Sequence, residues 1–246
     1  MQNEWFSSWF DTPYYHTLYK NRDDREACTF IDYLTQFLQL SPHAMCWDLC
    51  CGKGRHSIYL NKKGYNVIGT DLSDQSIKEA NKQANETLQF HEHDMRNMFR
   101  LNHFDAVLNL FTSFGYFDNK EDDLKVFSSV QKSLKNDGLF VLDFLNATYV
   151  RNNLVENDLK EIDGITFHIA KTIENNMVVK KINFSDRGEH FSFEERVHLY
   201  DKMYFEALAK QSGLEMTHTF GNYHLEKFDE RVSPRLILVF KKTNHL

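Results

Sequence analysis

A glycine-rich turn between a buried strand and a helix contains the residues best suited to chemistry. The apolar run 44–50 leads into Gly52 and Gly54, and a helical pattern starts at residue 55. Because glycine has no Cβ, such a turn lets a ligand approach the backbone closely. The next strand-like run ends in Asp71, whose carboxylate could accept both hydroxyls of an adenosine ribose. The spacing predicts a nucleotide- or nucleoside-binding turn.

The turn departs from the dinucleotide-binding pattern G-x-G-x-x-G. Cys50 stands at the first glycine position and Ser57 at the third, so a pyrophosphate fits this loop poorly. The pattern D-x-x-x-G-x-G fits better, with Asp48 on the strand and Gly52-Lys53-Gly54 in the turn. Asp48 could position a cofactor, and it could also be a buried structural carboxylate bonded to loop amides. One role does not exclude the other.

At these residues the chain resembles the class I S-adenosylmethionine-dependent methyltransferases. Segments similar to the family's later core motifs follow in the family's order, at 65–73, 90–96, 104–110, 138–144 and 233–240. The resemblance implies an α/β fold with a Rossmann-like, seven-stranded, mostly parallel sheet and helices on both faces. It also implies S-adenosylmethionine as the cofactor and methyl transfer as the reaction.

The resemblance assigns roles to single residues. In the family, the acidic residue that matches Asp71 holds the ribose, and its neighbour, here Leu72, packs on the adenine. Asp94 and the Met95 backbone would also meet the adenine. The full set expected to bind the cofactor is Asp48, Cys50, Gly52, Gly54, Asp71, Leu72, Asp94, Met95, Asn109 and Phe111.

Methyl transfer from a sulfonium is an in-line attack with a neutral leaving group, so positioning dominates the catalysis. A general base is needed only when the nucleophile arrives protonated. Tyr15, His16 and Tyr116 are the catalytic candidates, because each is expected near the mouth of the site. His198 and His224 are further candidates, although a lone histidine is more often structural.

Metal binding is not expected. His91 and His93 share one face of a strand, but no third ligand is evident nearby. The four cysteines show neither paired C-x-x-C spacing nor a disulfide framework. Arg22 and Arg55 could pair with the carboxylate of the cofactor, and surface charge is the alternative role for each.

Charge and loop composition favour a small-molecule methyl acceptor. Lys and Arg number 29 against 35 Asp and Glu, and the scattered basic residues count against a nucleic-acid substrate. Residues 109–112 lack the proline-rich tetrapeptide of the methyltransferases that modify DNA bases or glutamine. Two alternatives stay open: an NAD-dependent oxidoreductase, which Asp71 permits, and a non-catalytic protein that binds S-adenosylmethionine.

The patterns predict one methyltransferase domain over 1–246. An aromatic segment at 1–40, including an amphipathic helix, would form a lid, and 41–150 with 200–242 would form the cofactor-binding core. Three strand-like runs within 151–199 predict an antiparallel insertion that covers the substrate site. Within the core, a helix is expected over 74–86.

The composition favours a globular protein of the cytoplasm, as a monomer or homodimer. Hydrophobic residues make up 41% of the chain, and no run approaches the roughly 18 apolar residues of a membrane span. The first residues lack the basic and apolar regions of a signal peptide. No membrane partner is expected. The acceptor's identity and the atom that is methylated stay open.

Overall fold

The computed structural model describes residues 5–20 and 24–243. No helix within these ranges is long and apolar enough to cross a membrane. The elements are, in chain order, α1 (Trp5–Phe10), α2 (Pro13–Leu18), α3 (Asp24–Leu38), β1 (Met45–Leu49), α4 (Arg55–Lys62), β2 (Asn66–Asp71), α5 (Asp74–Ala80), η1 (Asn81–Gln83), β3 (Leu88–Glu92), β4 (Phe104–Asn109), α6 (Lys120–Ser133), β5 (Leu134–Leu145), α7 (Ala147–Asn152), β6 (Asn157–Ile162), β7 (Ile165–Glu174), β8 (Met177–Asp186), β9 (Glu189–His198), α8 (Lys202–Ser212), β10 (Leu214–Phe220) and β11 (Arg235–Lys242).

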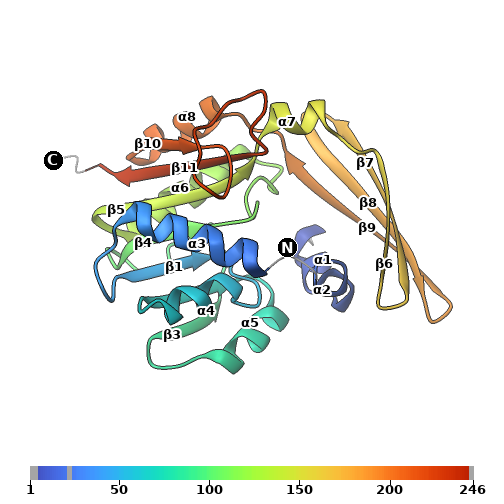
Figure 1. The fold of residues 1–246 in the computed structure, drawn as a ribbon, viewed down its shortest axis with the longest axis horizontal. Helices are drawn as coiled ribbons and strands as arrows, with labels where there is room; N and C mark the ends of the chain where they lie inside the picture. The colour runs from blue at the N-terminus through green and yellow to red at the C-terminus, as the bar shows by residue number, and fades with distance from the viewer. Residues whose placement is uncertain (1–4, 21–23, 244–246) are drawn as a thin grey trace.

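Seven strands form the main sheet in the order β10-β11-β5-β4-β1-β2-β3 (Figure 1). Strands β1 to β5 pair in parallel, whereas β11 runs antiparallel to both β5 and β10. The predicted fold class is confirmed. The strand order reverses at β1, which lies between β2 and β4. In open α/β sheets ligands bind beyond the carboxyl ends of the strands at such a switch point.

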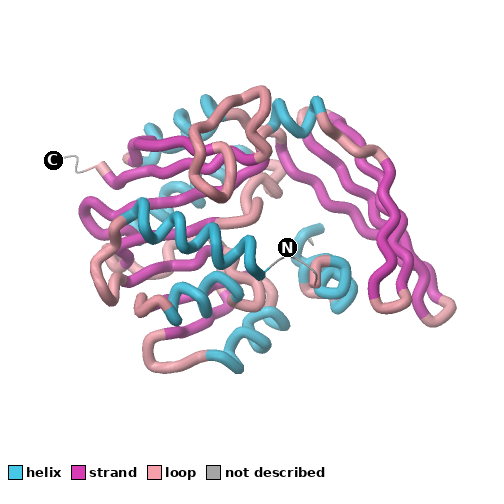
Figure 2. Tube along the Cα trace, in the orientation of Figure 1, coloured by secondary structure: helices cyan, strands magenta, loops and turns pink. Residues whose placement is uncertain are grey.

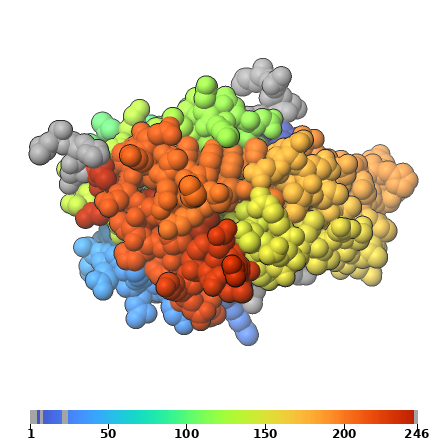
Figure 3. All heavy atoms as spheres, turned by 90° about the horizontal axis from the view of Figure 1, so that it is seen from above, coloured from blue at the N-terminus to red at the C-terminus, as the bar shows by residue number. Residues whose placement is uncertain are grey.

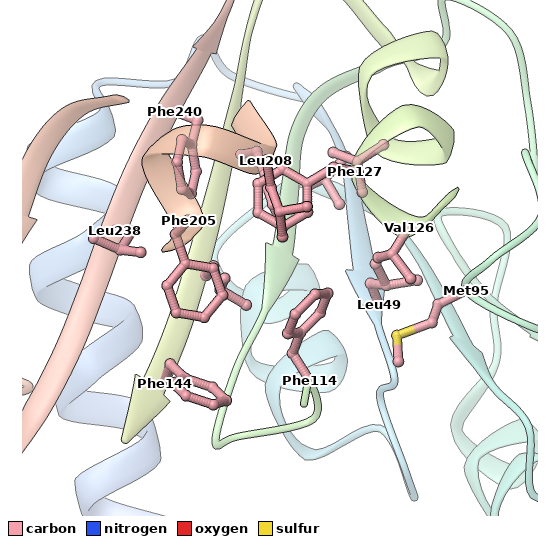
Figure 4. Close-up of a cluster of buried hydrophobic side chains, with 14 of the residues drawn as sticks. Leu49, Met95, Phe114, Val126, Phe127, Phe144, Phe205, Leu208, Leu238 and Phe240 are labelled. Carbon is pink, nitrogen blue, oxygen red and sulfur yellow. The ribbon is translucent and has the colours of Figure 1, made fainter. Parts of the chain in front are cut away.

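Helices cover both faces of this sheet, which is why its central strands are continuous apolar runs. Helices α3, α4 and α5 lie over one face, and α6 and α8 lie over the other (Figure 2). Figure 4 shows Phe114, Phe127, Phe144, Phe205 and Phe240 packed together between α6, α8 and the strands. This core fixes the strand ends that carry the candidate site.

The remaining strands form a separate antiparallel sheet in the order β6-β7-β8-β9, which projects to one side of the main sheet (Figures 1 and 3). One face buries Phe167 and Ile182 against Trp9 and Leu18 of the two N-terminal helices. Three strands were expected here and four are found. Strand β6 is missed because Asn157–Ile162 is polar and lacks apolar alternation.

The helix expected over 74–86 is shorter than predicted. Helix α5 ends at Ala80 and is followed by the single turn η1. The backbone of Asn85 exchanges hydrogen bonds with Leu88, and the Asn85 side chain accepts one from the Thr87 backbone N–H. Asparagine side chains compete with the helix for backbone groups in this way, so the chain turns early into β3.

Candidate functional site

The glycine turn predicted from the sequence lies between β1 and α4, and Gly52 and Gly54 have different roles in it. Gly52 (φ +55°) has nothing within 4 Å of the position that a Cβ would take, so that side of the turn is open. At Gly54 (φ +81°) a Cβ would lie 2.6 Å from the Phe90 ring. Gly54 is therefore required by internal packing, whereas Gly52 leaves room for a ligand. Cys50 also has a positive φ of 65°.

Asp71 joins this turn to the start of α5. Its Oδ2 accepts a hydrogen bond from the Gly52 backbone N–H at 2.8 Å, and its Oδ1 accepts one from the Ser73 N–H at 2.9 Å. Burial raises the pKa of Asp71, and the backbone N–H groups of Ser73 and Gly52 oppose that shift. The carboxylate is thus held rigidly at the end of β2, where a ribose would bind.

Asp48 and Asn109 lie beneath the turn. Asp48 is fully buried and accepts a hydrogen bond from the Ser57 hydroxyl at 2.5 Å, and burial raises its pKa to about 6. Asn109 is also buried and donates to the Leu49 carbonyl at 3.0 Å, which ties β4 to β1. Neither side chain lines either of the two cavities described below, and Gly54 does not either. These three expected cofactor residues support the turn from below.

A cavity of about 460 Å³ lies above the turn, and residues from the carboxyl ends of the strands and from the N-terminal helices line it. This volume suits a cofactor of nucleoside size. We call it the cofactor cavity. Of the expected site residues, those that line it are Tyr15, His16, Cys50, Gly52, Asp71, Leu72, Asp94, Met95, Phe111 and Tyr116. Arg55 lines it too, whereas Arg22 lies outside the described residues.

The side chain of Asp94 is already paired. Arg96 Nε donates to both of its carboxylate oxygens at 3.0 Å, and Arg96 Nη2 donates to Oδ2 at 2.6 Å. Burial alone would raise the pKa of Asp94, but the bonds from Arg96 outweigh it and the pKa is lowered. Asp94 therefore stays ionised beside Met95, and the Arg96 guanidinium balances its negative charge.

The histidines weighed for catalysis or metal binding are dispersed. His198 bonds the Phe117 carbonyl at 3.0 Å and lines neither cavity, and His224 lies in a second cavity described below. His93 lines the cofactor cavity and bonds the Asn97 carbonyl at 2.8 Å. Across the described part of the chain, no three His, Cys, Asp or Glu side chains are grouped so as to hold a metal.

His16 lies in the cofactor cavity as a neutral imidazole. Its Nε2 is buried and has no hydrogen-bond partner among the described residues. Burial, and then the Lys53 cation, lower the pKa of His16 to about 4, while Asp11 and Glu79 act weakly in the opposite direction.

Because the pKa of His16 is lowered in the folded protein, acidification destabilises the folded state. Between about pH 4 and 6.5 the unfolded chain takes up the His16 proton more readily than the folded protein, so acidification favours unfolding. We expect the unfolding free energy of the native protein to fall more steeply from pH 6.5 to pH 4 than that of His16→Gln. Urea unfolding across this range measures the difference.

The comparison between variants is needed because Asp48 acts in the opposite direction. Its raised pKa makes the folded protein bind a proton more readily over about pH 4 to 6, so acid favours the folded state there. Native protein and His16→Gln share Asp48, and its contribution cancels. Parallel pH profiles for the two proteins would contradict the buried, neutral state of His16.

A second cavity, of about 860 Å³, lies next to the cofactor cavity. Among the described residues, Phe111 and Tyr116 line both, and they belong to the loop that follows β4. We call residues 110–116 the wall loop. The second cavity is otherwise lined by Arg25, Glu26, Thr29, Thr112, Glu195, Val197, Asn222, Tyr223, His224, Pro234 and Arg235. Thr112 belongs to the hydroxyl-bearing loop that the sequence places at the methyl group, and His224 was a catalytic candidate. The other residues were not predicted, because no local pattern joins their separate segments.

The geometry fits S-adenosylmethionine better than a dinucleotide. Gly52 leaves the backbone open, and the turn has Cys50 in place of the first glycine that a pyrophosphate needs, whereas Asp71 would suit the adenosine ribose of either ligand. Arg55 lines this cavity together with Lys20 and Lys53, so side-chain cations that could meet the cofactor's carboxylate are present.

Comparison with known proteins agrees with this geometry. Residues 47–138 match the model of a family described as a methyltransferase domain. A Streptomyces venezuelae protein, dTDP-3-amino-3,4,6-trideoxy-alpha-D-glucopyranose N,N-dimethyltransferase, is 27% identical over 71% of this chain and 76% of its own length. The Bacillus subtilis protein YqeM is 35% identical over 39% of this chain, and the match spans only 40% of YqeM.

Solved structures show the same fold. An S-adenosylmethionine-dependent methyltransferase from Clostridium acetobutylicum superimposes with a TM-score of 0.78 at 21% identity, over 94% of this chain and 96% of that one. The fold and site define a Rossmann-like methyltransferase. The chain resembles the class I S-adenosylmethionine-dependent methyltransferases in these comparisons, and its residues 47–138 match the methyltransferase-domain family. The predicted family, enzyme class and cofactor are confirmed, and the oxidoreductase alternative is set aside.

Proposed function

We propose that the protein transfers the methyl group of S-adenosylmethionine to an amine nitrogen of a polar small molecule held in the second cavity. One observation carries this proposal: the two cavities meet at Phe111 and Tyr116, beyond the end of β4. Charged and hydroxyl-bearing side chains from four segments line the second cavity, which suits a polar ligand. The Streptomyces venezuelae relative supports the amine, since its name gives an amino sugar nucleotide as substrate.

The bound cofactor supplies an electrophilic methyl group on a sulfonium. The protein's part is to hold that group and the acceptor in line, which can be worth about 7–11 kcal/mol of the barrier. Of the three catalytic candidates, Tyr116 is the one that lines both cavities. Its hydroxyl donates to the Thr112 carbonyl, which fixes the ring in the wall loop. We propose that Tyr116 contacts the reacting nitrogen of the acceptor, whereas Tyr15 and His16 contact the cofactor.

A transfer assay with isotopically labelled S-adenosylmethionine tests the proposal. The amine panel consists of a dTDP-3-amino sugar, glycine and sarcosine, and the matched control is the same dTDP sugar with a hydroxyl in place of the amine. We expect saturable methylation of at least one panel member and none of the control. Methylation of the hydroxyl sugar would contradict the amine assignment. Tight cofactor binding without any transfer would favour the non-catalytic alternative.

We also propose that the N-terminal helices α1 and α2 are a lid on the cofactor cavity, backed by the four-stranded sheet. Trp9 is buried and stacks on Phe193 with centroids 4.3 Å apart, and its Nε1 donates to Glu195 at 2.8 Å. On the other side of the helices, Asp11 accepts a hydrogen bond from Ser73 at 2.6 Å. The lid thus joins the insertion to the cofactor-binding loops.

Replacing Trp9 with Ala should loosen this lid. The substitution removes a buried ring and its hydrogen bond, and such changes cost about 3–5 kcal/mol of local packing. Because the lost contacts belong to the lid and not to the core of the main sheet, we expect S-adenosylmethionine to dissociate about tenfold faster. The melting temperature should change little. Stopped-flow displacement measures the rate. Met203→Ala, on an exposed face of α8, is the control, and an unchanged dissociation rate in Trp9→Ala would argue against the lid.

A further inference from the structure

The wall loop between the two cavities has an unusual backbone. Phe111 and Thr112 are consecutive residues with φ of 59° each, in the left-handed region that favours glycine. Phenylalanine and the β-branched threonine are poorly suited to it. Backbone strain of this kind persists only where surrounding contacts hold it, and it gathers at functional sites. Some feature of the fold must therefore impose this conformation.

That feature is a buried ion pair. The Asp143 carboxylate accepts a hydrogen bond from the Phe111 N–H at 2.8 Å, and the Asp143 carbonyl accepts one from the Thr112 N–H at 3.1 Å. Arg235 Nε donates to the same carboxylate at 2.8 Å, and Arg235 Nη2 donates to the Thr112 hydroxyl at 2.7 Å. Asp143 is fully buried at the end of β5, and Arg235 starts β11.

The loop conformation in turn sets the position of the Phe111 ring. On the side of the second cavity, the ring stacks on Tyr223 with centroids 5.0 Å apart and planes 23° apart. On the cofactor side it lies 4.9 Å from the His56 ring, and the Arg55 guanidinium lies 4.9 Å from its centroid. The ring is thus a partition between the place of the cofactor and the place proposed for the acceptor.

We propose that Arg235 and Asp143 are positioning residues for methyl transfer, which hold Phe111 and Thr112 in the left-handed conformation and so set the partition between the cavities. The effect on transfer rests on the proposed function. The effect on the cofactor cavity rests on the geometry of Phe111 alone. A purely structural ion pair would stabilise the protein without being coupled to the conformation at Thr112.

Arg235→Lys is the first test variant. Lysine keeps a positive charge beside Asp143, but it lacks the planar fork that reaches the carboxylate and the Thr112 hydroxyl together. We expect kcat with the best acceptor of the amine panel to fall by about tenfold, with KM for that acceptor changed by less than about threefold. We also expect the Kd for S-adenosylmethionine to rise by about threefold or more. Arg231→Lys, an exposed residue of the same β10–β11 connection, is the matched control.

Rescue by glycine separates positioning from simple stability. Glycine adopts a positive φ without steric cost, whereas alanine keeps the Cβ and the strain. In the Arg235→Lys background, Thr112→Gly should therefore restore most of the lost kcat and cofactor affinity, and Thr112→Ala should restore neither. The single variants Thr112→Gly and Thr112→Ala leave the ion pair intact, and we expect the glycine variant to keep more kcat and cofactor affinity than the alanine variant. This pair of variants replaces the rescue experiment if Arg235→Lys does not fold.

The outcomes are distinct. Native kcat and cofactor affinity in Arg235→Lys, or equal behaviour of the glycine and alanine variants, would overturn the positioning role. If the native protein methylates no member of the amine panel, the proposed function fails. The cofactor affinities of the same variants, measured by calorimetry, then still decide whether the ion pair sets the wall loop.

Discussion

Replacing Asp71 with Asn is expected to weaken binding of S-adenosylmethionine by about 100-fold or more. A carboxylate in this place can accept two charge-assisted hydrogen bonds from a ribose, each worth about 1.5–3 kcal/mol. A loss of about 3 kcal/mol corresponds to roughly 100-fold in Kd. Asparagine has one acceptor oxygen, so it also cannot keep both backbone bonds, from Gly52 and Ser73, that Asp71 accepts. Calorimetric titration measures the change.

The matched control is Asp74→Asn. Asp74 is an exposed carboxylate three residues away, in the first turn of α5 and paired with Lys78 on the surface. Its substitution should leave the Kd within about twofold, since a surface ion pair contributes about 0–1 kcal/mol and does not face the cofactor. If Asp71→Asn bound the cofactor as tightly as this control, the ribose assignment would be wrong.

Changing each glycine of the turn to alanine should have different effects: Gly54→Ala should mainly lower the unfolding free energy, and Gly52→Ala should mainly lower the cofactor affinity. Both have positive φ, which costs an alanine about 1–2 kcal/mol. At Gly54 the new methyl group would also collide with the buried Phe90 ring, and such overpacking adds about 1–3 kcal/mol. Gly54→Ala should therefore lose about 2–5 kcal/mol of unfolding free energy.

At Gly52 the methyl group would point into open space on the cavity side. Gly52→Ala should lose only the backbone part of the stability and should mainly lose cofactor affinity. Urea unfolding and calorimetry on the two variants separate the effects. Equal losses of stability in both variants would contradict the distinction between a packing glycine and a ligand-facing glycine.

The core of the fold was predictable because its signals are local. The central parallel strands β1, β2 and β4 are buried on both faces, so each is a short apolar run bounded by turn residues. Gly213 with φ of 76° ends α8 as a left-handed C-cap, which is a stop signal that glycine carries locally. Strand β6 escaped because it is polar, and α5 ended early because Asn85 bonds its own turn. These two wrong predictions concern an edge strand of the smaller sheet and the end of a surface helix. Burial does not dictate the residue types at either place.

The candidate site was predictable only on the cofactor side. The glycine turn and Asp71 lie within 20 residues of chain, and their spacing is itself the signal. The wall loop depends instead on Asp143 and Arg235, which are 92 residues apart and meet only after β11 pairs with β5. A strand residue such as Asp48 can match a family motif and still lie beneath the turn, because the pattern does not show which side chains reach the cavity.

The most direct test of the account is a calorimetric titration of the native protein with S-adenosylmethionine and, separately, with NAD. We predict saturable one-to-one binding of S-adenosylmethionine and no binding of NAD, because the turn leaves room for a nucleoside and lacks the first glycine that a pyrophosphate needs. Binding of NAD without binding of S-adenosylmethionine would contradict the cofactor assignment and the methyl transfer derived from it.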